Sequence, residues 1–294
     1  MEKCSLCPRM CKVKREKNLP SDGFCKMPDS PVLARAALHF WEEPCISGEK
    51  GSGTVFFSGC SLGCVFCQNS KISTGGFGTP VTEERLSEIF DELVNLGANN
   101  INLVNPTHFA ASIRRVLKKK KPTVPVVYNS SGYERVETLR SLEGLIDVYL
   151  PDFKYVSSDV SAKYSGAADY FDFASKAIEE MIRQVGAPQY DENGLITKGV
   201  IIRHLILPQH TNESIKVLRY IWENYPKNIP VSLMCQYTPC SRAEEFPEIN
   251  RKITKREYEK VISAMLEMGF EDGFLQEISS AQSKYIPDFD LTGI

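Results

Sequence analysis

The sequence predicts an α/β fold in which a parallel sheet is covered by helices. From Gly51 onward, short apolar runs of strand length alternate with stretches whose apolar residues recur at helical spacing. This alternation is typical of strand–helix–strand units, which build parallel sheets. The pattern contains six clear strands and one doubtful strand. That is too few for a closed eight-stranded barrel, so we expect an open or partial barrel.

The predicted strands and helices follow one another along the chain. The strands span residues 54–57, 101–104, 124–128, 147–150, 200–207, 231–234 and 273–275, the last being the doubtful one. The helices span residues 82–96, 108–120, 136–142, 171–185, 214–224 and 257–268. Thr82 is the expected N-cap of the first helix, and Gly97 is its expected stop. Polar residues follow most of the strands, and in parallel α/β folds the chemistry lies at these carboxyl ends.

Residues 1–50 are predicted to form a separate unit. They carry five cysteines and several prolines but little apolar periodicity. A segment this poor in apolar repeats needs a stabilising cross-link, such as a bound metal, in order to fold. We therefore divide the chain into a Cys-rich, metal-binding N-terminal segment, residues 1–50, and a barrel domain, residues 51–294.

Composition and charge exclude several classes of protein. Hydrophobic residues make up 42% of the 294 residues, as in globular proteins. The net charge of −2 gives no sign of the basic surface that binds nucleic acid. No apolar run approaches the roughly 18 residues that span a membrane, and the N-terminus has no apolar signal region. We expect a cytoplasmic protein with no nucleic-acid or membrane partner. Cytoplasmic thiols stay reduced, so the ten cysteines predict metal binding.

The segment from Gly59 to Cys67 reads GCSLGCVFC and spaces its cysteines as C-x3-C-x2-C. Cysteine thiolates hold iron–sulfur clusters, and a cube has four irons to ligate. Cys60, Cys64 and Cys67 supply only three ligands, which leaves one iron open to an exogenous ligand. On spacing alone, a zinc loop that takes a fourth ligand from elsewhere is the alternative. The position directly after the first strand of a β/α chain disfavours zinc.

This cysteine motif, its place after the first strand and Phe66 before its last cysteine resemble the radical S-adenosylmethionine (SAM) superfamily. The resemblance implies a partial (β/α)6 TIM-like barrel with a [4Fe-4S] cluster on Cys60, Cys64 and Cys67. It also implies that the open iron binds SAM, and that reductive cleavage yields a 5′-deoxyadenosyl radical that abstracts a hydrogen atom. The residue matching Phe66 packs near the adenine in that superfamily.

Further motifs resemble the group related to the pyruvate formate-lyase activating enzyme, from Cys4 to about Asp290. They are GSGTVFFSGC at residues 51–60, CQN at 67–69, NPTHF at 105–109, YNSSGY at 128–133, YLPDFKY at 149–155 and RHLILP at 203–208. The resemblance implies activation of a glycyl radical enzyme. The ferredoxin-like insert that some activators carry after the radical loop is absent here.

Three charged residues are candidates for binding SAM. Asp152 and Lys154 lie directly after a strand, and a similar Asp-x-Lys helps to bind SAM in the activating enzymes; a loop salt bridge is the alternative. Arg203 lies inside an apolar strand, where a cation must be paired or bound to a ligand. The resemblance places the matching arginine near the SAM carboxylate, and a structural ion pair is the alternative. His204 faces the other way and is expected to pack in the core.

One departure from the superfamily pattern affects the second strand end. Many members carry a Gly-Gly-Glu stretch there, whereas this chain has Asn105, Pro106 and Thr107. Asn105 and Thr107 are candidates to replace those contacts with SAM. Ser130 and Ser131, at the next strand end, are candidates for the ribose or the ammonium group; capping or turn formation is the alternative.

Cys4, Cys7, Cys11 and Cys25 make a second set of four thiols. The number suits structural zinc or a second iron–sulfur cube, and four free thiols are the remaining alternative. Cys235 is expected in the core and Cys240 near the site mouth, where Gln236 and Tyr237 are candidate substrate contacts.

Three functions remain open. The first is a radical SAM enzyme that activates a glycyl radical enzyme, and the second is a radical SAM enzyme that modifies another peptide, cofactor or metabolite. The third is a non-catalytic, metal-stabilised scaffold. Both enzymatic functions need a low-potential electron, for which we expect a flavodoxin or ferredoxin as donor. The basic run 118–121 either ends a helix or docks such an acidic partner.

Overall fold

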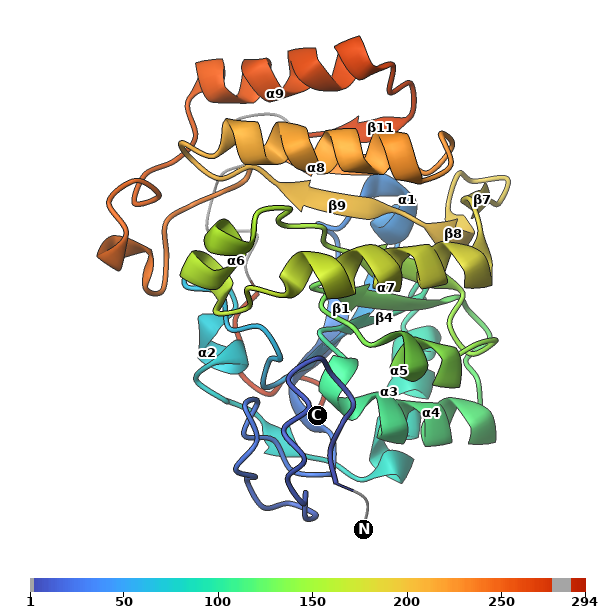
Figure 1. The fold of residues 1–294 in the computed structure, drawn as a ribbon. Helices are drawn as coiled ribbons and strands as arrows, with labels where there is room; N and C mark the ends of the chain where they lie inside the picture. The colour runs from blue at the N-terminus through green and yellow to red at the C-terminus, as the bar shows by residue number, and fades with distance from the viewer. Residues whose placement is uncertain (1–2, 277–286) are drawn as a thin grey trace.

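The computed structural model describes residues 3–276 and 287–294 and shows an α/β fold with a mostly parallel sheet (Figure 1). Within these residues, the larger sheet has eight strands in the order β3-β1-β2-β4-β5-β6-β8-β7, and the smaller has three in the order β11-β10-β9. The strands are β1 Val32–His39, β2 Ser52–Phe57, β3 Thr79–Pro80, β4 Ile101–Val104, β5 Val126–Ser130, β6 Val148–Pro151, β7 Gln189–Tyr190, β8 Ile196–Val200, β9 Ile202–Leu205, β10 Val231–Met234 and β11 Gly273–Leu275.

Parallel pairing runs from β2 through β4 and β5 to β6, and again from β9 through β10 to β11. The two sheets meet where an isolated parallel bridge joins Asp152, just after β6, to Arg203 of β9. At this junction the Phe153 amide donates to the Arg203 carbonyl at 2.8 Å. The carboxyl ends of these strands therefore share one edge, where ligands bind in parallel α/β folds.

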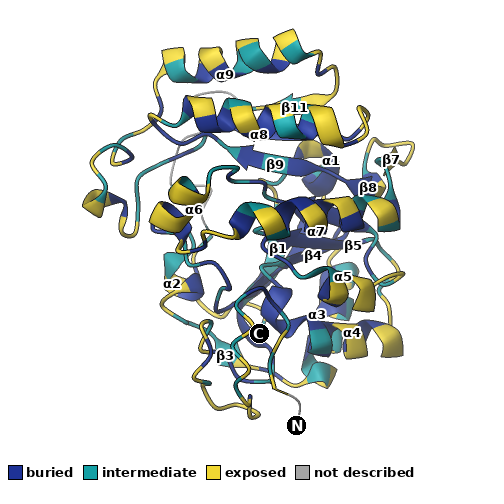
Figure 2. Ribbon diagram, in the orientation of Figure 1, coloured by how far each residue is buried: buried dark blue, intermediate teal, exposed yellow. Residues whose placement is uncertain are grey.

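The helices cover the outside of the sheets, and each buries one face (Figures 1 and 2). Neighbouring helices also pack against each other: α3 with α4, α5 with α7, α6 with α7, and α8 with α9. The α-helices are α1 Pro44–Ser47, α2 Ser70–Ser73, α3 Glu83–Asn95, α4 Ala110–Lys119, α5 Val136–Ser141, α6 Ser158–Ser165, α7 Tyr170–Val185, α8 Thr211–Asn224 and α9 Lys255–Met268, with short 3-10 turns at Thr107–Phe109 and Ala243–Glu245. Among the described residues, no helix is both long enough and apolar enough to cross a membrane.

Most of the predicted elements are confirmed within a few residues. The strands over 101–104, 231–234 and 273–275 have the predicted bounds. Thr82 caps α3 as expected, since its side chain accepts a hydrogen bond from the Arg85 amide at 3.1 Å. The predicted strand over 200–207 was too long, because the chain leaves the larger sheet after Val200 and enters the smaller one at Ile202.

The sequence pattern did not reveal β1. This strand is rich in alanine, which has low strand propensity, and it pairs antiparallel with β2. The division of the chain at residue 50 stays a prediction, and β1 lies before that boundary while its partner β2 lies after it.

Glu134 is a buried carboxyl in the loop between β5 and α5. Thr107 Oγ1 donates a hydrogen bond to its Oε1 at 2.6 Å, and the Tyr128 hydroxyl donates to Oε2 at 3.4 Å. Burial raises the pKa of Glu134 from 4.5 to about 7. Between these two values the folded protein holds a proton that the unfolded chain has lost. The free energy of unfolding therefore falls as the pH rises from 4.5 to 7, and the loss persists above pH 7.

Replacing Glu134 with glutamine should remove this pH dependence, because the amide is neutral and still accepts from Thr107. We expect Glu134→Gln to gain about 3 kcal/mol over the wild type between about pH 5 and pH 8, measured by urea unfolding at both values. Glu137→Gln on the exposed face of α5 is the matched control. Parallel pH profiles for wild type and Glu134→Gln would contradict a buried carboxyl that titrates in this range.

Candidate active site

The loop that carries Cys60, Cys64 and Cys67 connects β2 to α2. Gly59 begins it with φ of +82°, a left-handed conformation that glycine adopts without strain. A Cβ at this position would lie 2.3 Å from Met27 Cγ and 3.1 Å from the Cys25 carbonyl oxygen. The loop therefore rests directly on the N-terminal segment.

The three cysteines open onto one cavity of about 140 Å³. The strand ends contribute most of its other walls, which include Asn105, Asn129, Ser130, Ser131, Asp152, Lys154 and Arg203. The cavity thus brings the cysteine loop together with seven residues from the ends of four strands, six of which the sequence singled out.

Each of the three sulfurs receives a hydrogen bond. The Leu62 amide donates to Cys60 Sγ at 3.3 Å, Ser165 Oγ donates to Cys64 Sγ at 3.0 Å, and Ser73 Oγ donates to Cys67 Sγ at 3.3 Å. Burial raises the pKa of Cys67 to about 12, so the bare site holds a thiol and metal binding would release its proton. These donors suit metal-bound thiolates, whose charge they stabilise.

The cysteines do not converge on one point. Within residues 3–276 and 287–294, no three cysteine, histidine, aspartate or glutamate side chains lie close enough to hold a single metal ion. In an iron–sulfur cube each thiolate binds a different iron, so the thiolates do not have to meet. The donor set on this loop therefore fits a cluster better than a mononuclear zinc.

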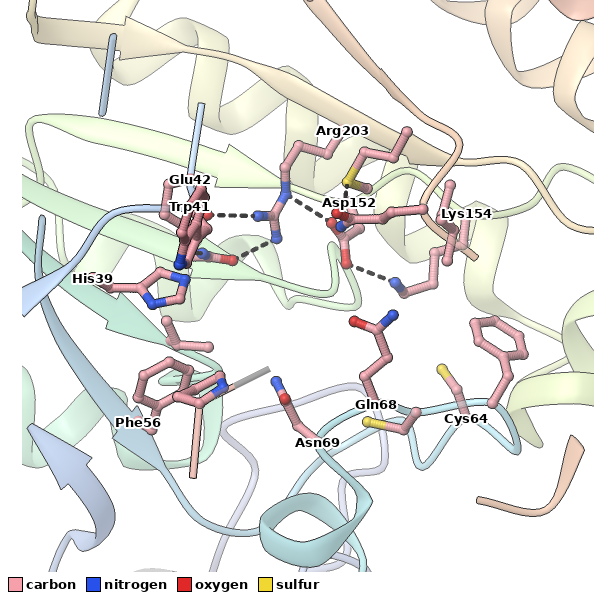
Figure 3. A pocket seen from close by; sticks show the side chains of 18 residues that line it. His39, Trp41, Glu42, Phe56, Cys64, Gln68, Asn69, Asp152, Lys154 and Arg203 are labelled. Atoms are coloured by element: carbon pink, nitrogen blue, oxygen red, sulfur yellow. Dashed lines mark hydrogen bonds and ion pairs between the residues drawn. The ribbon is translucent and has the colours of Figure 1, made fainter. Parts of the chain in front are cut away.

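A buried network of charges forms the opposite wall (Figure 3). Arg203 donates from Nε to Asp152 at 3.0 Å, from Nη1 to Glu42 at 3.2 Å and from Nη2 to the Asn129 side-chain oxygen at 2.6 Å. Lys154 Nζ lies 2.6 Å from the other Asp152 oxygen. Burial alone would raise the pKa of Asp152, but Lys154 and Arg203 outweigh it and hold that pKa below its usual value. Asp152 therefore stays ionised at neutral pH.

A second cavity of about 250 Å³ continues from the first and shares Cys64, Cys67, Asp152, Lys154 and Arg203 with it. The chain after β1 adds a wall to it, formed by His39, Trp41 and Glu42. Figure 3 shows these three residues across the cavity from Cys64 and Lys154. Together the two cavities have room for a ligand that contacts both the cysteine loop and the charged network.

The remaining predicted site residues lie in different places. Phe66 lines the larger cavity and packs edge-on against Tyr237, with ring centroids 5.8 Å apart. Asn105 adopts a left-handed conformation and donates to the Gly59 carbonyl at 2.5 Å. Thr107 is buried and turned toward Glu134, away from both cavities. His204 packs in the core, where its Nδ1 lies 2.7 Å from the Phe153 carbonyl.

Sequence reasoning missed several residues of the site. Ser165 reaches Cys64 from α6, about a hundred residues along the chain, and no local pattern could indicate that contact. Glu42 comes from the segment assigned to a separate unit. The adjacent acids Glu42 and Glu43 within an otherwise cysteine-rich stretch were the available signal.

A sequence model of the radical SAM superfamily matches residues 54–221, which is more than half of the chain. The chain belongs to the radical SAM superfamily. Membership implies an enzyme that uses a [4Fe-4S] cluster and SAM, and it argues against a non-catalytic scaffold. The chain is also 33% identical over 271 residues to "Uncharacterized protein MJ0674" of Methanocaldococcus jannaschii, a match that covers 88% of this chain and 73% of that protein.

A solved structure shares the fold at low sequence identity. Streptococcus suis SuiB bound to its precursor peptide SuiA aligns with a TM-score of 0.50 and 12% identity, over 76% of this chain and 48% of SuiB. Methylornithine synthase (PylB) aligns with a TM-score of 0.49 and 16% identity, over 73% of this chain and 62% of PylB. This chain thus spans less than two thirds of each solved structure, and the likeness concerns the fold alone.

The N-terminal cysteines of this radical SAM protein also have donors at each sulfur. The Phe24 amide donates to Cys11 Sγ at 3.3 Å, and Arg15 Nη1 approaches Cys4 Sγ at 4.0 Å. Backbone hydrogen bonds from Arg9 and Met27 lower the pKa values of Cys7 and Cys25, although burial outweighs them and raises both. Like the sulfurs of the radical loop, these four belong to no group of three described side chains that could hold a single metal ion. Their N–H donors would suit metal-bound thiolates.

Arg9 joins this N-terminal segment to the radical loop. Its guanidinium donates to the carbonyls of Ser61 at 2.8 Å and Leu62 at 3.3 Å, which lie between Cys60 and Cys64. The same group donates to the carbonyls of Ser165 at 3.3 Å and Gly166 at 2.7 Å. One side chain therefore fixes both the cysteine loop and the serine that hydrogen-bonds to Cys64.

Arg9→Lys should loosen the radical loop, because an ammonium has three donors in a compact group and cannot serve all four carbonyls. We expect the cluster on this loop to be lost to a chelator about tenfold faster than in the wild type. The measurement is the decay of the SAM-sensitive EPR signal of the reduced protein. Arg85→Lys on the surface of α3 is the matched control, and equal decay in both variants would contradict the role of Arg9.

Proposed function

We propose that this chain reductively cleaves SAM at a [4Fe-4S] cluster bound by Cys60, Cys64 and Cys67. The observation that supports it best is the single cavity shared by these cysteines and the Asp152–Lys154–Arg203 network. When bound, the cluster and SAM supply an electron and a 5′-deoxyadenosyl radical. The residues of the chain bind and orient SAM and exclude water. The six parallel strands β2, β4, β5, β6, β9 and β10 would form the partial barrel around them.

The chain offers candidate partners for several parts of SAM. Lys154 and Arg203 are the cations that would attract its carboxylate, and Asp152 is the ionised acid between them. Ser131 is a further candidate, since its buried Oγ has no hydrogen-bond partner among the described residues and lines the cysteine cavity. Asn105 and Ser130 lie beside it, and Phe66 would contact the adenine. Thr107, by contrast, would act only through Glu134.

The substrate of this reaction has two proposed classes. The motif resemblance favours a glycyl radical enzyme, whose activation would leave a glycyl radical with a characteristic EPR doublet. The second class is another peptide, a cofactor or a metabolite. A flavodoxin or ferredoxin would donate the electron. Lys120 and Lys121 form ion pairs with Asp91 at 2.5 Å and Asp147 at 2.7 Å, so docking of an acidic donor would depend mainly on Lys118 and Lys119.

Anaerobic SAM cleavage tests the proposed function. The protein is reconstituted with iron and sulfide, reduced and mixed with SAM, and 5′-deoxyadenosine is quantified. We expect product from the wild type and essentially none from Cys60→Ala, Cys64→Ala or Cys67→Ala, because each variant removes a cluster ligand. Cys45→Ala and Cys235→Ala replace cysteines outside the three-cysteine loop and should retain activity.

Two results of this experiment would contradict the proposed function. An intact cluster that neither binds nor cleaves SAM would overturn the proposal. Zinc at both cysteine sets, with a colourless protein, would favour the scaffold function instead.

We also propose that Cys4, Cys7, Cys11 and Cys25 bind a second metal group, either zinc or an iron–sulfur cluster, within the segment 1–50. Replacing Cys4 and Cys25 together with serine should remove that metal and leave the SAM-sensitive EPR signal of the radical loop in place. Elemental analysis of iron and zinc, with Cys235→Ser as control, measures the loss. An unchanged metal content would mean that these cysteines bind nothing.

A further inference from the structure

A third cavity, of about 380 Å³, lies on the far side of Arg203 from the cysteine loop. It shares Trp41, Glu42, Arg203, Met234 and Gln236 with the larger cavity of the candidate site. Its remaining walls come from the start of α1, from β10 and from the edge strand β11: Glu43, Pro44, Ser232, Gly273, Phe274, Leu275 and Gln276. A ligand in this third cavity can therefore extend past Arg203 toward the cysteines.

Two buried oxygen atoms in this cavity lack a hydrogen-bond partner among the described residues. One is Oε2 of Glu43, a residue that is only 8% exposed, and the other is Oγ of Ser232, which is 1% exposed. Ser232 lies close enough to the Glu43 carboxyl to lower its pKa, although the geometry of the two groups makes no hydrogen bond. Leaving such atoms unpaired in a buried site is unfavourable, and more so for a charged group. Both atoms can accept a hydrogen bond from a ligand.

The charges of the site do not balance. Glu42, Glu43 and Asp152 are three carboxylates, and they face the two permanent cations Lys154 and Arg203 across the connected cavities. Arg203 already donates to Asp152, Glu42 and Asn129, and it acts on Glu43 only through space, without a hydrogen bond. Glu42 is likewise satisfied, because it accepts from Asn102, Asn129 and Arg203. Of the three carboxylates, Glu43 is therefore the one without a direct ion pair among the described residues.

We propose that the third cavity binds the primary ammonium group of the substrate, with Glu43 and Ser232 as its acceptors. An ammonium carries three donors and no acceptor, which suits an unpaired carboxylate oxygen beside an unpaired hydroxyl. Trp41 and Phe274 supply aromatic walls that can contact the cation and pack against its alkyl stem. The stem then reaches past Arg203 and presents a C–H bond toward the cysteine loop. This role as a substrate site rests on the radical SAM function proposed above.

Two sources could supply such a group, a free alkylamine or a lysine side chain in a peptide. Isothermal titration of the anaerobic, cluster-loaded protein separates them. The probes are 1-pentylamine for the free amine and Nα-acetyl-lysine N-methylamide for the peptide source. The neutral comparators are 1-pentanol and Nα-acetyl-norleucine N-methylamide, and Nα-acetyl-arginine N-methylamide tests a guanidinium.

We expect at least one amine to bind about 10- to 100-fold more tightly than its neutral comparator, and Glu43→Gln to abolish that preference. Ser232→Ala should weaken the amine severalfold. Glu49→Gln, the same substitution on the exposed end of the neighbouring turn, should leave the preference intact. Because the readout is a ratio of affinities within one protein, partial loss of folding in a variant does not mimic the result.

Several outcomes would overturn this inference. They are equal binding of amines and neutral comparators, no amine binding at millimolar concentration, a guanidinium preferred over both amines, and a preference that survives Glu43→Gln. The result is independent of SAM cleavage, which is measured as 5′-deoxyadenosine in the same preparation. Cleavage without amine preference would leave the proposed function standing and remove the ammonium site. Amine binding without cleavage would leave the ammonium site standing and overturn the proposed SAM cleavage.

Discussion

The buried carboxylate of Asp152 holds the two sheets and the candidate site together. It follows β6 directly, bridges to Arg203 of β9 and binds Lys154 with its second oxygen. Two cations offset the cost of burying its charge, which keeps the carboxylate ionised. Removing one member of a buried ion pair leaves the partners uncompensated, so the junction of the sheets and the charge pattern of the cavity depend on the same interaction.

A second constraint comes from the N-terminal segment, which supports the radical loop from behind. Arg9 binds two carbonyls of that loop, while Arg15 donates to the carbonyls of Met27, Pro28 and His108. His108 Nε2 in turn lies 2.6 Å from the Ser58 carbonyl, two residues before Cys60. Hydrogen bonds from this segment thus reach both ends of the stretch 58–62.

The sequence patterns predicted those features of the structure that depend on neighbouring residues in the chain. The alternation of apolar runs and helical spacing gave the parallel strands and most helices, and residues such as Asp152 and Arg203 stood out because a charge directly after or inside a buried strand needs a partner. The contacts that complete the site are long-range. Ser165 of α6 donates a hydrogen bond to Cys64, and Glu42, which follows β1, pairs with Arg203. The sequence did not predict β1, because alanine has a low strand propensity. Thr107 points toward Glu134, to which it donates a hydrogen bond. The sequence could not predict this contact, because the burial of Glu134 becomes evident only in the folded structure.

The thiols of the radical loop show why cluster binding and folding are coupled in this chain. Burial raises the pKa of Cys64 as well as Cys67, so without metal the folded loop favours neutral thiols next to the ionised Asp152. Three thiolates in that place would add negative charge to a region with more carboxylates than cations. A cluster supplies the positive charge that permits deprotonation, and Lys154 lowers the pKa of Cys64 in the same direction. The hydroxyls of Ser165 and Ser73 can donate to a thiolate without carrying charge themselves. The hydrogen-bond donors at the three sulfurs thus suit a metal-bound state in which every sulfur is ionised.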